Sequence, residues 1–307
     1  MTLYLLTRVP PALGFEPAGV DLRLAPWWLS GWLLILAALA GLGLAVFWLQ
    51  WRLRWLMRRN LKLEEEGRAT AEALARAGQA LEAASLVDAV TGLHNRKFLE
   101  PNLANDAQQA QRAFKDMLAA GRDPLAARED LLLFLLDLDY FKHINETWGR
   151  AAGDAVLAQL AQRLKTITRK TDFRVRWDEG TFLLVARRAR RSGAVQVARK
   201  LMEDVRDLTF QLPEGATLRE RLSIGFSAFP PHPCHPDLGT WQQALGLAEQ
   251  CLAAAKGSGR DRWVGALLEP GADPAPLRGQ DRWNLPWAVA RGLIRVDCSE
   301  PGLVWPS

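Results

Sequence analysis

The sequence predicts a layered domain of the α/β or α+β class, carried on a single membrane-spanning helix. Three observations lead to this prediction: a long uncharged segment near the N-terminus, a proline-free stretch after it, and short apolar runs that alternate with amphipathic segments from residue 88 onward. Strands that alternate with helices indicate a sheet covered by helices.

The segment 27–49 carries no charged residue and is long enough to cross a membrane as a helix. About 20 apolar residues span the hydrocarbon core, and tryptophans stand at both ends of this segment, where membrane interfaces favour them. Basic residues follow it at Arg52, Arg54, Arg58, Arg59 and Lys62. A positive flank faces the cytoplasm, so we expect a single-pass inner-membrane protein with its N-terminus outside. A cleaved signal peptide is the alternative.

Two further segments flank the predicted span. Residues 1–26 are too few to form a core, and they fit either the end of a larger outer sensor domain or a short outer tail. Residues 50–87 contain no proline and are rich in alanine, leucine, glutamate and arginine, which predicts one continuous signalling helix. Leu74 and Leu81 are seven residues apart, a spacing that fits a parallel coiled coil in a homodimer. A solitary amphipathic helix fits it equally well.

The residues from 88 to 266 are predicted to form the folded domain. Apolar runs that fit buried strands occupy 131–136, 182–185 and 222–226, and amphipathic helices are expected at 153–166 and 194–208. The polar stretch 104–129 is either a long helix or a surface insertion. Proline, glycine and aspartate become frequent after Val264, so we expect residues 267–307 to be a poorly packed tail with one returning strand at 293–296.

Composition and charge narrow the classes of partner. The net charge of +5 permits an acidic partner such as a nucleotide or an anionic lipid surface. No basic block is interleaved with aromatic residues, so we expect no nucleic-acid partner. Cys234, Cys251 and Cys298 lie far apart without a CxxC pair, which indicates a reducing compartment. His232, Cys234 and His235 are too few for a zinc site.

The segment 137–157 (DLDYFKHINETWGRAAGDAVL) has the strongest chemical signal, because it directly follows the apolar run at 131–136. Asp137 and Asp139 are two residues apart, so in a strand they point to the same side of the sheet. They also lie at its carboxyl edge, where α/β sheets bind ligands. Carboxylates there suit Mg²⁺ bound together with substrate phosphates. A solvated strand end is the alternative.

Five segments, taken together and in order, resemble the GGDEF (diguanylate cyclase) domain family. Residues 88–96 are similar to DxLTGLxNR, 137–157 to DxDxFKxINDxxGHxxGDxxL, 222–230 to SIGVAxxP and 248–262 to ADxALYxAKxxGRNR. Residues 174–185 fall where the family has its strand, hairpin and second strand. The resemblance implies an α+β fold of the nucleotidyl-cyclase type, with a central, mostly antiparallel sheet flanked by helices. It also implies cyclic di-GMP signalling, in which a homodimer condenses two GTP with the help of Mg²⁺.

The resemblance assigns roles by position. Asp137 and the backbone carbonyl of Leu138 match the metal ligands. The positions that match phosphate-facing or guanine-binding residues are Phe141, Lys142, Asn145, Asp154, Lys256 and Arg260. Glu146 and Arg150 depart from the usual Asp and His, and we expect nucleotide binding to tolerate both changes.

The hairpin itself departs from the family pattern. Family members have Gly-Gly-(Asp/Glu)-Glu-Phe where residues 178–182 are Asp-Glu-Gly-Thr-Phe. Gly180 replaces the metal-binding acid implicated in catalysis, and Thr181 replaces the Glu after it. We therefore expect a membrane-bound relay that binds GTP or cyclic di-GMP but does not synthesise cyclic di-GMP. The alternatives are an active cyclase that uses the displaced Asp178 or Glu179, and a dimerisation or docking module that binds no nucleotide.

Arg169 and Asp172 form an RxxD pattern five residues before the hairpin, where the family has its inhibitory product-binding site. An arginine can fork onto a phosphate or a guanine edge, and an aspartate can accept from guanine N–H groups. The pattern fits binding of cyclic di-GMP. A surface salt bridge is the alternative.

Overall fold

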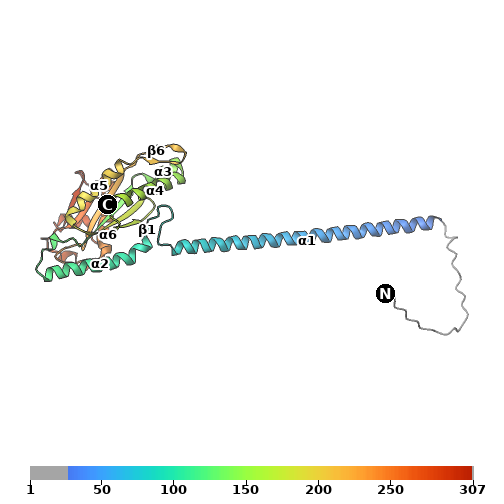
Figure 1. Ribbon diagram of the computed structural model, residues 1–307, viewed down its shortest axis with the longest axis horizontal. Helices are drawn as coiled ribbons and strands as arrows, with labels where there is room; N and C mark the ends of the chain where they lie inside the picture. Colours follow the sequence, from blue (N-terminus) through green and yellow to red (C-terminus); the bar gives the residue numbers. More distant parts are fainter. Residues whose placement is uncertain (1–26, 306–307) are drawn as a thin grey trace, which may run out of the picture. The chain divides into compact units, whose positions relative to one another are not determined.

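The computed structural model describes residues 27–305 (Figure 1). The chain divides into two units, one ending at Ala83 and one beginning at Ala84, and each is described by itself. The predicted outer segment, residues 1–26, lies outside the described residues.

Helix α1 (Trp27–Ala84) runs without interruption for 58 residues, so the predicted span and signalling helix form one helix. Among the described residues, it is the one helix long and apolar enough to cross a membrane, judged by length and composition alone. Arg52 and Arg59 stack over the rings of Trp48 and Trp55, at 5.0 and 5.3 Å from the ring centroids. The coiled coil and the homodimer involve a second chain and stay predictions.

The second unit is built on a seven-stranded sheet with the order β1-β3-β4-β2-β7-β8-β9. Its strands are β1 (His94–Asn95), β2 (Asp130–Leu138), β3 (Phe173–Arg176), β4 (Thr181–Ala189), β7 (Leu222–Phe229), β8 (Trp263–Leu268) and β9 (Ile294–Cys298). Neighbours pair antiparallel except β1 with β3 and β7 with β8. The predicted α+β class with a mostly antiparallel sheet is confirmed, and the three predicted strands lie within β2, β4 and β7.

Helices cover both faces of this sheet (Figure 1). They are α2 (Arg96–Ala119), α3 (Phe141–Trp148), α4 (Arg150–Ile167), α5 (Ala194–Arg206), α6 (Trp241–Gly257) and the short α7 (Leu285–Ala290). A small hairpin, β5 (Phe210–Gln211) with β6 (Thr217–Leu218), completes the unit. The helices expected at 153–166 and 194–208 are present as α4 and α5, and the stretch 104–129 begins as part of α2.

Strand β2 shows why the two faces differ. Successive side chains of a strand point to opposite faces. Leu132, Phe134 and Leu136 therefore pack with α4 and α5, while Leu133 and Leu135 pack with α2 and α6. The run of leucines is apolar at every position because both faces are buried, as expected of a central strand.

The prediction of a poorly packed C-terminal tail is wrong. The predicted returning strand is present as β9, which pairs with β8, and the residues between them form a third apolar cluster with the outer side of α6. Trp283 is fully buried there, and its indole nitrogen donates to the Leu277 carbonyl at 3.0 Å. The prolines and glycines mark turns between apolar residues that the composition alone concealed.

Candidate functional site

The first candidate site lies where the end of β2 meets the turn between β3 and β4. Asp137 pairs across the strands with Thr181, and the Leu138 amide donates to the Gly180 carbonyl at 3.1 Å. The turn is closed by Trp177 N–H donating to the Thr181 carbonyl at 2.9 Å. The strand register therefore places the altered hairpin directly beside Asp137.

Both carboxylate oxygens of Asp137 have partners within the protein. Thr181 Oγ1 donates to Oδ2 at 2.5 Å, and Lys256 Nζ lies 2.7 Å from Oδ1. Lys256 comes from the last turn of α6, a helix that begins with a capping box at Thr240 and Gln243. The residue that replaces the family Glu thus acts as a hydrogen-bond donor to the remaining acid.

These residues do not fit a Mg²⁺ site. Mg²⁺ demands near-octahedral oxygen ligands and is usually held by one or two carboxylates together with phosphates and water. Gly180 offers no side chain, and Asp137 is already paired with an ammonium group. In residues 27–305, no cluster of three or more Asp, Glu, His or Cys side chains is arranged to hold a metal ion.

A cavity of about 740 Å³ surrounds this site and is called the Asp137 cavity below. Its charged side chains are three cations (Lys142, Lys256 and Arg260) and four carboxylates (Asp137, Glu146, Asp178 and Glu179). Leu138, Phe141, Gly180 and Thr181 also line it. All eleven of these residues were singled out from the sequence, and the fold brings them together. Asn145 and Asp154 do not line this cavity; they lie on α3 and α4.

Gly153 explains the close approach of α3 and α4 near Asn145. A Cβ atom at position 153 would lie 1.8 Å from Asn145 Oδ1, so any larger residue there would force the Asn145 side chain to move. Asp154 follows on α4 and contributes to the charge around Arg176. The two predicted guanine-binding residues are thus adjacent in space to one tight helix–helix contact, outside the Asp137 cavity.

Arg176 was not predicted from the sequence. Burial lowers the pKa of its guanidinium, opposed by the nearby carboxylates of Asp88, Asp154, Asp178 and Glu179. Its Nε donates to the Asp178 carbonyl at 2.6 Å, and its guanidinium lies over the Phe182 ring. Arg176 therefore ties the altered turn to the domain. The position of Arg176, shortly before the hairpin, was the feature of the sequence that could have identified it.

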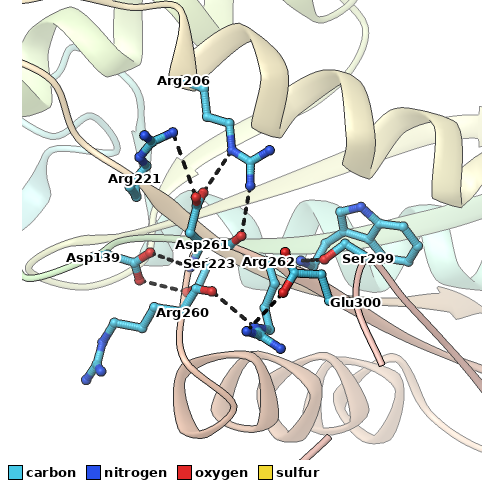
Figure 2. A network of polar contacts seen from close by, with 10 residues as sticks. Asp139, Arg206, Arg221, Ser223, Arg260, Asp261, Arg262, Ser299 and Glu300 are labelled. Carbon is cyan, nitrogen blue, oxygen red and sulfur yellow. Dashed lines mark hydrogen bonds and ion pairs between the residues drawn. The ribbon is translucent and has the colours of Figure 1, made fainter. Parts of the chain in front are cut away.

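Asp139 does not join Asp137 as predicted. It is 1% exposed and accepts from Ser223 Oγ at 2.7 Å and from the Asp261 amide at 2.9 Å (Figure 2). Burial raises the pKa of this carboxyl, with the two hydrogen bonds acting in the opposite direction. The expectation of two carboxylates on one side fails because β2 ends at Leu138, so strand alternation no longer applies at Asp139.

The network in Figure 2 instead holds the loop that carries Arg260. Arg260 and Asp261 have φ angles of 63° and 47°, in the left-handed region that L-residues seldom adopt. Asp261 pairs with Arg206 at 2.9 Å. Arg262 donates to the Arg260 carbonyl at 3.1 Å. The Arg260 side chain extends away from these contacts and stacks over Tyr140, 4.6 Å from the ring centroid.

The RxxD residues lie in a different part of the domain. Asp172 is 7% exposed, and its oxygens accept from the backbone amides of Arg169 at 3.0 Å and Arg187 at 3.2 Å. Its carboxylate therefore shapes the loop rather than pairing with the exposed Arg169 side chain in a surface salt bridge.

A second cavity of about 400 Å³, called the Arg169 cavity below, opens beside these residues. Five cations and one carboxylate line it, namely Arg128, Arg169, Arg188, Arg190, Lys200 and Asp172. Its apolar lining includes Leu132, Ile167, Leu184, Val197 and Leu201. Only Arg169 and Asp172 were predicted, because the other cations come from separate segments that the fold alone brings together.

A buried ion pair anchors the segment that follows β4 and carries Arg190. Arg191 is 7% exposed and binds Asp130, 1% exposed, through Nη2 at 2.6 Å and Nε at 3.1 Å. Arg191 also donates to the carbonyls of Pro230 and Pro231. Burial raises the pKa of Asp130, and Arg191 opposes that rise.

The fold and the position of the site define an α+β domain of the nucleotidyl-cyclase type. The family model for the diguanylate cyclase GGDEF domain matches residues 85–262, more than half of the chain, and the chain belongs to the GGDEF family.

Individual relatives share about 30% sequence identity or less with this chain. The chain is 30% identical over 135 residues to diguanylate cyclase A from Treponema denticola, covering 44% of this chain and 35% of that protein. It is 27% identical over 193 residues to the probable diguanylate cyclase DgcC from Escherichia coli K12, covering 63% and 46%. The matched region thus spans between a third and a half of these relatives. The solved structure of the diguanylate cyclase SiaD from Pseudomonas aeruginosa, in complex with its activator SiaC, is 27% identical with a TM-score of 0.48, covering 76% of this chain and 80% of that one.

Proposed function

We propose that this chain is a non-catalytic GGDEF protein that binds cyclic di-GMP in the Arg169 cavity and relays a signal from the membrane. The observation that carries the proposal is the composition of that cavity, in which five cations and one carboxylate surround an apolar lining. Cyclic di-GMP carries two phosphate charges and two flat bases. Arginine side chains bind phosphate and guanine edges bidentately, and apolar side chains accept the base faces.

The arrangement at Asp137 supports the loss of catalysis. Phosphoryl transfer depends on metal ions that neutralise the phosphates and align the reacting groups. Asp137 is engaged by Lys256 and Thr181, and the third hairpin position is Gly180. The Asp137 cavity thus keeps cations for phosphates but has no carboxylate at the third and fourth hairpin positions.

The proposal includes the location of the protein. Helix α1 would anchor it in the inner membrane with the N-terminus outside and the GGDEF domain in the cytoplasm, because the basic residues after residue 49 favour the cytoplasmic side. The part of α1 beyond the membrane would pair two copies as a coiled coil. Ligand binding in the domain would then be coupled to the paired α1 helices of a dimer.

Binding of fluorescently labelled cyclic di-GMP to the full chain in detergent tests the proposal. We expect Arg169→Ala to weaken binding about 10- to 100-fold, the usual range for one charge-assisted contact. Arg122→Ala, which removes an exposed arginine outside the cavity, is the matched control. Asp172 is a poor target because its loss would free two backbone amides. Equal affinity of the Arg169→Ala variant and the parent would contradict the proposed site.

A second candidate, an active diguanylate cyclase, has one observation in its favour: Asp178 and Glu179 line the same cavity as Asp137. Incubation of the full chain with GTP and Mg²⁺ distinguishes an active cyclase from a non-catalytic binding protein. Formation of cyclic di-GMP that stops in an Asp137→Asn variant would establish the cyclase. A chain whose melting temperature responds to neither GTP nor cyclic di-GMP would instead be a docking module, because ligands that bind the folded state raise that temperature.

A further inference from the structure

Asp137 already has a positive charge at its side. Lys256 Nζ lies 2.7 Å from Oδ1, and the hydroxyl of Thr181 occupies Oδ2. Lys256 and Asp137 both line the cavity, so the paired ammonium and carboxylate face the same space. A divalent cation that bound Asp137 would first have to displace this ammonium, and neither Gly180 nor Thr181 supplies a carboxylate in return.

We propose that the Asp137 cavity binds the phosphate chain of a nucleoside triphosphate without a divalent cation, with the Lys256 ammonium in the metal's place. The inference rests on the proposed loss of catalysis. An ammonium group has three N–H donors, so one remains on Asp137 while the others bind phosphate oxygens. Lys142 and Arg260 supply two further cations in the same cavity.

Lys256 and the loop that follows it are held in place before a ligand arrives. Lys256 sits on a capped helix, and the loop after it is tied to the C-terminal segment. Ser258 Oγ accepts from the Val304 amide at 2.7 Å, and Arg262 pairs with Glu300 at 3.3 Å. The segment beyond residue 262 lies outside the family match. Groups held in the bound geometry lose less entropy on binding.

The carboxylates of the cavity limit the affinity without preventing binding. Asp137 is neutralised by Lys256, and Glu146 lies 3.7 Å from Lys142. Asp178 and Glu179 lie close enough to Arg176 to oppose the lowering of its pKa. The cavity is therefore close to neutral, and we expect GTP to bind through short-range contacts rather than through long-range attraction.

Titration of the full chain in detergent with GTP, in excess EDTA and in excess Mg²⁺, tests the inference. We expect the two dissociation constants to agree within about threefold, less than the tenfold that 1.4 kcal/mol of metal contribution would produce. In EDTA, Lys256→Met should weaken GTP binding about tenfold or more, because it removes a charged donor. Lys256→Arg should restore binding, and Lys165→Met, at an exposed lysine of α4, is the matched control.

Three results would overturn the inference. They are GTP binding that disappears in EDTA, metal-free binding that survives Lys256→Met, and a melting temperature that GTP changes neither in EDTA nor in Mg²⁺. Cyclic di-GMP binding, measured on the same samples, keeps the two proposals apart. If it persists and responds to Arg169→Ala while GTP fails to bind without metal, the inference fails and the proposed function stands. If the chain converts GTP to cyclic di-GMP, the proposed loss of catalysis is wrong, and the inference that rests on it is wrong as well.

Discussion

The Asp137 cavity and the Arg169 cavity belong to one domain but differ in charge. The Asp137 cavity has three cations and four carboxylates, whereas the Arg169 cavity has five cations and one carboxylate. The first is open and polar, and the second has a larger apolar share. The substituted hairpin places its two acids at Asp178 and Glu179 instead of at positions 180 and 181, within the Asp137 cavity, and contributes no residue to the Arg169 cavity.

The cations of the two cavities are also held differently. Arg260 depends on a polar network around Asp139 and Asp261, which is partly exposed. Arg190 directly precedes Arg191, whose pair with Asp130 is buried. A buried ion pair is costly to break from one side, because the remaining charge is left unpaired. We therefore expect the Arg169 cavity to be the more sensitive of the two to a single anchoring substitution.

The largest expected effect comes from restoring the family hairpin. A variant with Asp178→Gly, Glu179→Gly, Gly180→Asp and Thr181→Glu returns two acids beside Asp137. We expect cyclic di-GMP production from GTP and Mg²⁺ to rise roughly 1,000-fold above the parent, since a bound metal contributes several kcal/mol. A Cβ at position 180 would lie 3.1 Å from Phe141 Cβ, so Phe141 must shift slightly.

The control for the restored hairpin is the same variant with Asp137→Asn, which should be inactive. If the restored variant stays inactive while it folds and binds GTP, the difference between the cavities does not lie in the hairpin alone. Glu146 and Arg150, the two other departures from the family motif, would then be the next positions to change.

The next largest effect concerns the anchor of the Arg169 cavity. Arg191→Met leaves Asp130 buried without its partner, which should lower the free energy of unfolding by about 3–5 kcal/mol. Urea unfolding of the full chain in detergent, followed by tryptophan fluorescence, measures this change. Arg295→Met removes an exposed pair with Asp297 and should cost less than about 1 kcal/mol. Equal losses in both variants would show that Asp130 and Arg191 are not a stabilising anchor.

A smaller effect should appear with pH at His232, next to the same anchor. Burial, followed by the positive charges of His235 and Arg191, lowers the pKa of His232 from 6.5 to about 4. Its Nδ1 accepts from the Cys234 amide at 3.2 Å, which requires that nitrogen to be unprotonated. Between pH 6.5 and 4 the unfolded chain binds more protons, so the free energy of unfolding falls as the pH falls, by at most about 3 kcal/mol.

Urea unfolding at neutral pH and at pH values down to about 4 measures the His232 effect. The buried carboxyls of Asp130 and Asp139 have raised pKa values and act in the opposite direction, because the folded state takes up their protons first. The comparison with His232→Gln, which cannot take up a proton, isolates the histidine. Identical pH dependence in the parent and this variant would contradict the assignment.

Much of the fold and half of the candidate site were predictable from the sequence. The apolar runs located β2, β4 and β7. The motif positions assigned Asp137, Lys256 and Arg260 to one site, and the three residues line one cavity. The errors have physical causes. Asp139 lies one residue past the end of a strand, where the two-residue alternation stops. The packed tail was missed because its apolar residues are separated by turns and reach their partners on α6 only in the folded chain.

The sequence by itself determined the family and the displacement of the hairpin acids from positions 180 and 181, because both depend on which residue types occupy consecutive positions. Only the tertiary structure decided that Lys256 and Thr181 would take both oxygens of Asp137, and that five cations from separate segments would surround one apolar cavity. Residue identity fixes the charge that a side chain can carry. Its partner and its burial depend on contacts between distant segments, which a single sequence does not specify.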